Sequence, residues 1–294
     1  MANKTLNNLL STYNRVPILG CHDALSAIIG ENAGFKALWA SSLGLSTVQG
    51  RRDAGELTWS EILNLASNIT DATDIPLLVD GDNGHGDYNI TRLFAVKLFK
   101  AGVSGISIED QLFPKRNSFM EKNQELEDAE TFCGKIAAIK DSLGEDLTVV
   151  ARVEALVVGQ GIDVALDRAY AYVEAGADAI IIHSKSSDAS DVASFVQSWD
   201  QPNPLILIPT SYHKSLSQYI VGLKVGGVVW ANQMLRVQVT ALQKVAAELL
   251  ANQNPDTLEP MSSLKEIFSL VGLDNLPIED LTYQRRSVIK KNHD

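Results

Sequence analysis

The residues best suited to chemistry in this chain lie in one segment, Ile108 to Phe119, which reads Ile-Glu-Asp-Gln-Leu-Phe-Pro-Lys-Arg-Asn-Ser-Phe. The segment begins as an apolar strand that ends in an acidic pair, Glu109 and Asp110, and a carboxylate at a strand end can hold a metal ion. The loop that follows supplies two cations, an amide and a hydroxyl, on Lys115, Arg116, Asn117 and Ser118. Because such a loop can close over an anionic ligand and exclude water, the segment predicts a metal and an anion at one site.

A second acidic pair comes earlier, in Asp80-Gly-Asp-Asn-Gly-His-Gly86. Asp80 and Asp82 are two residues apart at a predicted strand end, so their side chains can point the same way. Glu109 ends the next strand, and three carboxylates without a Cys or His pair favour a hard cation, Mg²⁺ ahead of Mn²⁺. The alternative is that the two aspartates only form a turn, since the segment is rich in turn residues. Glu109 on the neighbouring strand favours the metal.

Two further polar residues end apolar strands. Arg152, in Val149-Val-Ala-Arg-Val-Glu-Ala-Leu156, either pairs with Glu154 or another carboxylate, or offers its planar fork to a carboxylate or phosphate ligand. His183 ends Ile180-Ile-Ile-His and is either a satisfied core histidine or a site residue. Asp53 follows the second predicted strand and is expected near the same site.

The elements that must position these residues repeat one pattern: a helix, then Ala-Gly, then a short apolar strand. Glycine just past a helix can adopt the left-handed conformation that ends it. The strands lack alternation, as parallel strands buried on both faces do. Eight strands are predicted, at Val16–Gly20, Ala37–Trp39, Pro76–Asp80, Gly105–Ile108, Thr148–Val153, Ala179–Ile182, Pro204–Ile208 and Gly227–Trp230. Eight strands with mostly helical connections favour an α/β fold of the (β/α)8 barrel type, and no G-x-G-x-x-G follows the first strand to suggest a dinucleotide fold.

Polar residues gather where these strands end, at the rim that carries the active site in such barrels. They are Trp39, Ser41, Ser42, Asp80, Asp82, Glu109, Asp110, Arg152, Glu154, His183, Ser184, Thr210 and Asn232. Contributions from so many strands predict a single shared site. We expect residues 1–251 to form the catalytic barrel with its long last helix, Asn232–Ala251. Residues 252–294 are expected to form a linker and a helical extension that ends in a solvated basic tail.

Composition restricts the partners. The net charge of −11 argues against nucleic acid, which requires a basic face. No apolar run approaches the roughly 20 residues of a membrane span, and the N-terminus lacks a signal-peptide pattern. Two cysteines, Cys21 and Cys133, are too few for a disulfide framework, so we expect free thiols and a cytoplasmic protein. A local cluster of cations still permits a small anionic substrate.

Motifs along nearly the whole chain resemble the phosphoenolpyruvate mutase family of the isocitrate lyase superfamily. They are Gly20-Cys-His-Asp-Ala-Leu-Ser26, Ala33-Gly-Phe-Lys-Ala-Leu-Trp-Ala-Ser-Ser42, Asp80-Gly-Asp-Asn-Gly-His-Gly86, Glu109-Asp-Gln-Leu-Phe-Pro-Lys-Arg-Asn-Ser118, Val150-Ala-Arg-Val-Glu-Ala155, Ala175-Gly-Ala-Asp-Ala-Ile-Ile-Ile-His-Ser-Lys185, Ile208-Pro-Thr210 and Val229-Trp-Ala-Asn232. The resemblance implies a modified (β/α)8 barrel whose C-terminal helix swaps between subunits. It also implies a homotetramer built as a dimer of dimers.

The resemblance also assigns roles. It implies Mg²⁺ held chiefly by Asp80, with Asp82 and Glu109 acting mostly through water. Substrate is received by Trp39, Ser41, Ser42 and Leu43, partly through backbone amides, and its phosphoryl and carboxylate groups by Arg152 and His183. Asp53 matches the essential aspartate beside the transferring group. Lys115, Asn117 and Ser118 match the family's gating loop.

The loop sequence separates the reactions of the superfamily. The carbon–carbon lyases of the superfamily carry Cys-Gly-His in this loop, and the cysteine is their general acid. This chain has Asn-Ser-Phe at the same place. Phosphonopyruvate hydrolases have threonine where this chain has Asn117. The resemblance therefore implies a mutase that interconverts phosphoenolpyruvate and 3-phosphonopyruvate. The alternatives are a phosphonopyruvate hydrolase, or a barrel that binds pyruvyl ligands without turnover.

Three segments depart from the mutase pattern. This chain has Asp80-Gly-Asp-Asn-Gly-His-Gly86 where the mutase pattern has Asp-Ala-Asp-Thr-Gly-Tyr-Gly. It has Glu109-Asp-Gln in place of Glu-Asp-Lys, and Arg52-Asp-Ala-Gly-Glu in place of Arg-Asp-Ser-Asn-Glu. These changes lie near the expected metal and loop, so a related phosphonate-pathway enzyme is a further alternative.

Overall fold

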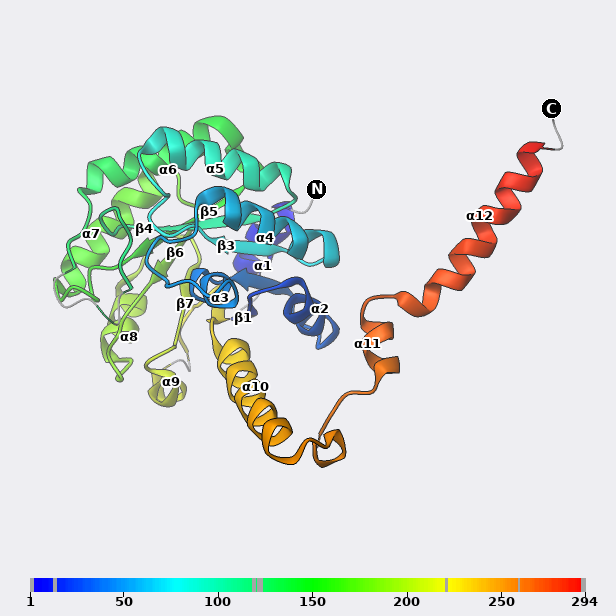
Figure 1. The fold of residues 1–294 in the computed structure, drawn as a ribbon. Helices are drawn as coiled ribbons and strands as arrows, with labels where there is room; N and C mark the ends of the chain where they lie inside the picture. The colour runs from blue at the N-terminus through cyan, green and yellow to red at the C-terminus, as the bar shows by residue number, and fades with distance from the viewer. Residues whose placement is uncertain are drawn as a thin grey trace. The chain divides into compact units, whose positions relative to one another are not determined.

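A computed structural model of the chain describes residues 3–12, 15–117, 120, 124–219, 222–258 and 260–291. Eight parallel strands close into a barrel in sequence order (Figure 1). The strands are β1 (Val16–Cys21), β2 (Ala37–Ala40), β3 (Leu77–Asp80), β4 (Gly105–Glu109), β5 (Thr148–Val153), β6 (Ala179–Ile182), β7 (Leu205–Leu207) and β8 (Gly227–Trp230). The predicted (β/α)8 barrel is confirmed, and each predicted strand differs from the observed one by no more than one residue at either end.

The barrel wall separates two apolar layers. Side chains such as Leu78, Ile181 and Val229 fill the interior of the barrel. The alternate strand residues, such as Val79 and Ile180, face the surrounding helices and join a larger core there. Both faces of each strand are therefore buried, which explains why the strands read as continuous apolar runs.

Helices cover the outside of the barrel and continue past it. They are α1 (Asn3–Thr12), α2 (Ala24–Asn32), α3 (Ser42–Val48), α4 (Trp59–Ala72), α5 (Tyr88–Lys100), α6 (Ala129–Leu143), α7 (Gly161–Glu174), α8 (Ser190–Ser198), α9 (His213–Tyr219), α10 (Gln233–Asn252), α11 (Leu264–Leu270) and α12 (Leu276–Lys291). Short 3₁₀ turns lie at Gly144–Asp146, Pro255–Thr257 and Leu273–Asn275. Side-chain caps fix several helix starts; Asp23 and Thr58, for example, form capping boxes before α2 and α4.

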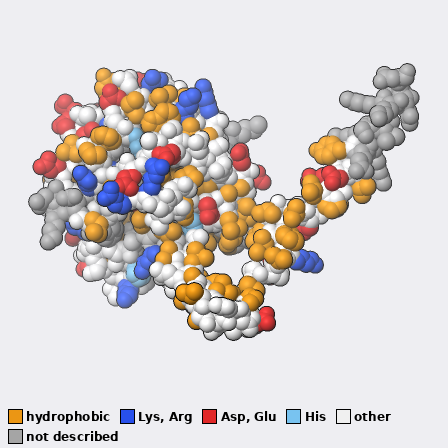
Figure 2. Space-filling view, viewed as in Figure 1, with side chains coloured by type: hydrophobic (Ala, Val, Ile, Leu, Met, Phe, Trp, Pro, Cys, Tyr) orange, Lys and Arg blue, Asp and Glu red, His pale blue; other side chains and the backbone are white. Residues whose placement is uncertain are grey.

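The chain divides into two compact units, residues 1–237 and 238–294, and the boundary falls within α10. The second unit exposes many apolar side chains, including Leu264, Ile267 and Phe268 of α11. Figure 2 shows hydrophobic side chains along the surface of this part of the chain. Residues 252–294 contain the expected helical extension, and α12 runs through the basic residues of the tail. Among the helices of the described residues, none combines the length and the apolar character that crossing a membrane requires.

Candidate active site

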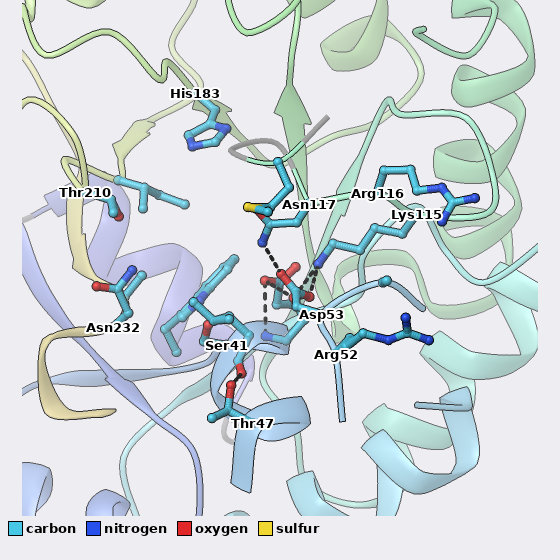
Figure 3. Close-up of a pocket in the computed structure, with 18 of the residues that line it drawn as sticks. Ser41, Thr47, Arg52, Asp53, Lys115, Arg116, Asn117, His183, Thr210 and Asn232 are labelled. Carbon is cyan, nitrogen blue, oxygen red and sulfur yellow. Dashed lines mark hydrogen bonds and ion pairs between the residues drawn. The ribbon is translucent and has the colours of Figure 1, made fainter. Parts of the chain in front are cut away.

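A cavity of about 800 Å³ lies among the carboxyl ends of the strands and the loops that follow them (Figure 3). Its lining includes six basic side chains: Arg51, Arg52, Lys115, Arg116, Arg152 and Arg236. Two carboxylates, Asp53 and Asp80, also line it. Cations therefore outnumber carboxylates in the lining although the chain carries a net charge of −11, and cations at the cavity surface favour an anionic ligand.

The first charged cluster, which we call the loop network, consists of Ser42, Asp53, Asp82, Lys115 and Asn117. The Lys115 ammonium donates hydrogen bonds to Oδ1 of Asp53 at 2.7 Å and to Oγ of Ser42 at 2.6 Å, and it pairs with Oδ1 of Asp82. The Asn117 amide donates to Oδ2 of Asp53 at 2.7 Å. Figure 3 shows Lys115 and Asn117 reaching from their loop to Asp53. Asp53 thus accepts hydrogen bonds from two of the predicted loop residues, Lys115 and Asn117.

Charge is buried throughout the loop network. The Lys115 side chain is only 7% exposed. Burial alone would lower the pKa of Lys115, but Asp82 and Asp53 raise it well above its usual value. Burial alone would raise the pKa of Asp53, but the Lys115 cation and the Asn117 hydrogen bond lower it. The pKa of Asp82 is raised by burial and by Asp80, against the opposing effect of Lys115. The network therefore holds Lys115 as a cation beside an ionised Asp53.

Helix α3 brings the segment that is expected to receive substrate against the Asp80 carboxylate. Ser41 caps this helix, with the Gly44 amide donating to its hydroxyl at 3.5 Å. The Ser42 amide and hydroxyl both donate to Oδ2 of Asp80, at 3.3 and 3.0 Å. Asp80 thus accepts a hydrogen bond from a backbone amide of the segment that is expected to receive substrate. Trp39 at the end of β2 is buried, and its indole N–H meets no acceptor among the described residues, so it is a donor available to a ligand in the cavity.

The second cluster, the strand network, consists of Glu109, Arg152, Glu154 and His183. Glu109 of β4 and Arg152 of β5 are register partners. The Arg152 guanidinium lies 3.2 Å from Oε2 of Glu109 and 2.5 Å from Oε1 of Glu154. Nδ1 of His183 lies 2.8 Å from Glu154 and 2.8 Å from a guanidinium nitrogen. Arg152 therefore has structural carboxylate partners and also lines the cavity, so the geometry permits both roles considered from the sequence.

Electrostatics fix the charge states of the strand network. Burial would raise the pKa of Glu154, but Arg152 and then His183 lower it below its usual range. Burial, and next the Arg152 cation, lower the pKa of His183, so its imidazole is neutral near pH 7. The pKa of Glu109 is raised well above its usual value by burial, although Arg152 opposes the shift. Arg152 is thus a permanent cation held in place by carboxylates.

The donor set around Asp80 fits a magnesium ion held by few protein ligands. Among the described residues, no three His, Cys, Asp or Glu side chains converge as an all-protein cage. Asp80 lines the cavity, while both oxygens of Glu109 are buried and accept no hydrogen bond from any described residue; Oε2 has only its ion pair with Arg152. Asp82 is also buried. Mg²⁺ usually takes one or two carboxylates and keeps several waters, so one lining carboxylate with two behind it suits this ion.

The residues expected at the site divide into three groups. Those that line the cavity are Trp39, Ser41, Ser42, Leu43, Asp53, Asp80, Lys115, Asn117, Arg152 and His183. Asp82 and Glu109 do not line it and lie buried behind it. Ser118 lies outside the described residues.

Sequence reasoning missed several lining residues. Arg236, in the first turns of α10, carries no motif signal beyond its place just after the strand-end residue Asn232. Thr47, at the end of α3, reads in the sequence as an ordinary helix residue. Thr210 and Asn232 were expected on the rim without an assigned role, and both line the cavity.

Comparison with known proteins shows the family to which the chain is similar. The family model described as phosphoenolpyruvate phosphomutase matches residues 6–250. A phosphoenolpyruvate phosphomutase of Streptomyces hygroscopicus is 40% identical over 281 residues, 95% of this chain and 90% of that protein. The crystal structure of such an enzyme from Streptomyces platensis subsp. rosaceus superposes with a TM-score of 0.93 at 35% identity, covering 96% of this chain and 99% of that one. A phosphonopyruvate hydrolase solved with oxalate and Mg²⁺ gives a TM-score of 0.89 at 34% identity, covering 97% and 99%.

Proposed function

Since this chain belongs to the phosphoenolpyruvate phosphomutase family, we propose that it interconverts phosphoenolpyruvate and 3-phosphonopyruvate. In this isomerisation the phosphorus leaves the enol oxygen and bonds to C3, so no water or second substrate is consumed. The observation that carries the proposal is the contact of Lys115 and Asn117 with Asp53 at a basic cavity. The amide of Asn117 can donate hydrogen bonds to a phosphoryl group, but it cannot act as the general acid that a cysteine provides in the lyases.

The charge distribution suits a phosphoryl group in transit. Phosphoryl transfer passes through a loose, metaphosphate-like species, which is stabilised mainly by positioned charge and by exclusion of water. Arg152 is fixed by Glu154 and Glu109 and would contact the phosphoryl or carboxylate oxygens together with His183. Asp53 and Asn117 would lie beside the transferring group. Trp39, Ser41, Ser42 and Leu43 would receive the pyruvyl part.

A magnesium cofactor is part of the proposal. Asp80 would hold Mg²⁺, with Asp82 and Glu109 binding its water ligands. The ion would neutralise charge on the pyruvyl oxygens as a Lewis acid. The buried oxygens of Glu109 and the lining position of Asp80 support this assignment.

Product analysis by ³¹P NMR tests the reaction. With phosphonopyruvate and Mg²⁺, a mutase converts the carbon–phosphorus signal into that of an enol phosphate. Conversion to inorganic phosphate would instead identify a phosphonopyruvate hydrolase. An unchanged signal, with the ligand bound, would identify a barrel that binds pyruvyl compounds without turnover.

For the whole chain we propose a catalytic domain at residues 1–251, with an extension at 252–294, in a cytoplasmic homotetramer. The exposed apolar side chains of α10 and α11, such as Leu242 and Phe268, support burial against another subunit, including exchange of α10. Sedimentation of the purified protein tests the tetramer. The two free cysteines are consistent with a reducing compartment.

A further inference from the structure

A buried lysine outside the cavity connects two segments that carry site residues. Lys135 lies on α6 and is 1% exposed. Its ammonium donates a hydrogen bond to the backbone carbonyl of Asn83 at 2.9 Å and forms an ion pair with Oε2 of Glu127 at 2.8 Å. Asn83 directly follows Asp82, and Glu127 lies just after the loop that carries Lys115. Lys135 therefore contacts the carboxylate segment and the far flank of the loop.

The near flank of the loop is attached to the same asparagine. The Asn83 side-chain amide donates to the carbonyl of Leu112 at 3.1 Å. The flanks also meet each other, because Gln111 and Leu126 form an isolated antiparallel bridge. Both flanks are thus tied to Asn83, one by its side chain and the other through Lys135.

Glu127 is held by its amide, its carbonyl and its carboxylate. Its amide donates to the carbonyl of Asp110 at 2.9 Å, and its carbonyl accepts a hydrogen bond from Arg168 at 3.1 Å. Its carboxylate takes the Lys135 ammonium. Loss of that cation would leave a largely buried carboxylate without its ion-pair partner. Because an unpaired buried charge is destabilising, we expect the flank that carries Glu127 to move.

We propose that Lys135 is a positioning residue that holds both flanks of the loop against the carboxylate segment through Glu127 and Asn83. This placement would align Lys115 and Asn117 with the carboxylates of Asp53 and Asp82. Lys135 does not touch the cavity. Its effect on turnover, which rests on the proposed function, passes through the alignment of the two segments.

The matched test compares Lys135→Met with Lys140→Met. Lys140 lies on the same helix and forms its own ion pair with Asp178 at 2.9 Å, remote from the loop. Methionine keeps the length of the side chain and removes the charge in both variants. A difference between them therefore reports the contacts of Lys135 rather than the general cost of losing an internal lysine.

The first measurement does not depend on the reaction. Arg116 is exposed and next to Lys115 and Asn117, so trypsin cleavage after Arg116, identified by mass spectrometry, reports how firmly this part of the loop is held. We expect Lys135→Met to be cleaved faster than wild type, with or without oxalate and Mg²⁺, and Lys140→Met to match wild type. Equal cleavage of the two variants would overturn the proposal, whether or not the protein is a mutase.

The second measurement uses activity. Supporting partners of a metal site typically change affinity or activity by about 10- to 100-fold, so the Mg²⁺ concentration for half-maximal rate should rise on the order of tenfold in Lys135→Met. The share of phosphonopyruvate released as phosphate should also rise, because a misaligned loop admits water. A fall in rate with both values unchanged would indicate a purely structural lysine and overturn the proposal.

Two milder variants keep the test valid if Lys135→Met does not fold. Glu127→Gln retains an oxygen that can accept from the ammonium, and Asn83→Ala removes only the bond to Leu112. Both should show the same direction of change in cleavage and Mg²⁺ requirement, to a smaller degree. Wild-type behaviour in both would contradict the coupling.

Discussion

The loop network and the strand network each surround one buried cation with carboxylates, yet the chain assembles them in different ways. Arg152 meets Glu109 and Glu154 because these residues lie on or beside adjacent strands whose register is fixed by the barrel. Lys115 meets Asp53 from a loop, across 62 residues of sequence. The strand network is therefore set by the fold, whereas the loop network exists only while the loop lies over Asp53.

This difference assigns different tasks to two similar clusters. A cation fixed by strands can act as preorganised charge for a bound anion, since it needs no rearrangement during the reaction. A cation and an amide on a loop can be withdrawn to admit substrate and returned to exclude water. Asp80 is electrostatically coupled to the cations of both networks, which makes its carboxylate their common element.

The largest effect is expected from removing that common element. Asp80→Ala takes away the proposed principal magnesium ligand and should abolish activity at any Mg²⁺ concentration. It should also abolish the rise in thermal stability that Mg²⁺ gives the wild type, because a ligand stabilises only the state that binds it. Thermal melts with and without Mg²⁺ measure this. Retained Mg²⁺ stabilisation in the variant would assign the metal to other residues.

Arg152→Lys tests the strand network. Lysine keeps the charge but not the planar fork that joins Glu109 and Glu154, so the variant should fold yet lose on the order of 10²-fold in turnover. Steady-state kinetics and circular dichroism check the two parts. A rate near that of wild type would reduce Arg152 to a structural ion pair with Glu154.

The contrast between the networks also explains what the sequence could reveal. The strands were predicted to within a residue because strands buried on both faces are uninterrupted apolar runs, and polar residues at their ends stand out against them. Glu109, Arg152 and His183 were singled out as candidates in this way. The contact of Lys115 with Asp82 depends on how a loop folds back, which local pattern does not encode.

Outside the barrel the prediction was weaker for a physical reason. Helix α12 is rich in charged and polar residues, and its first residues with described side chains are exposed, so its sequence lacks the apolar stripe that marks a packed helix. Lys135 was also missed. A lysine within an amphipathic helix normally reads as surface, and its burial becomes visible only when Glu127 and Asn83 are brought to it.

Asn117→Ala tests the loop network. It removes the amide proposed to hold the phosphoryl group in transit, together with its hydrogen bond to the Asp53 carboxylate. A hydrogen bond to a charged group contributes roughly 1.5–3 kcal/mol, so loss of the bond to the phosphoryl group should slow isomerisation by about tenfold or more. The fold and Mg²⁺ stabilisation should be unchanged, because Lys115 still pairs with Asp53 and Asp82. Asn117→Thr should raise the ratio of phosphate to phosphoenolpyruvate formed from phosphonopyruvate. Full isomerisation in the alanine variant would show that the loop amide does not act on the phosphoryl group.

The smallest effect is expected from Glu109→Gln, which separates a residue behind the cavity from one that lines it. Glutamine keeps the shape of the side chain and an oxygen that can accept from Arg152, so the barrel and the position of the guanidinium should persist. If Glu109 binds magnesium only through water, the Mg²⁺ requirement should rise by about tenfold at most, as for other supporting partners of metal sites. Glu154→Gln is the matched control, because Glu154 also contacts Arg152 but has no proposed role at the metal. Mg²⁺ titrations of activity in both variants decide the point. Loss of activity at every Mg²⁺ concentration, as expected for Asp80→Ala, would make Glu109 a direct ligand, and an equal shift in both variants would trace the effect to Arg152 instead.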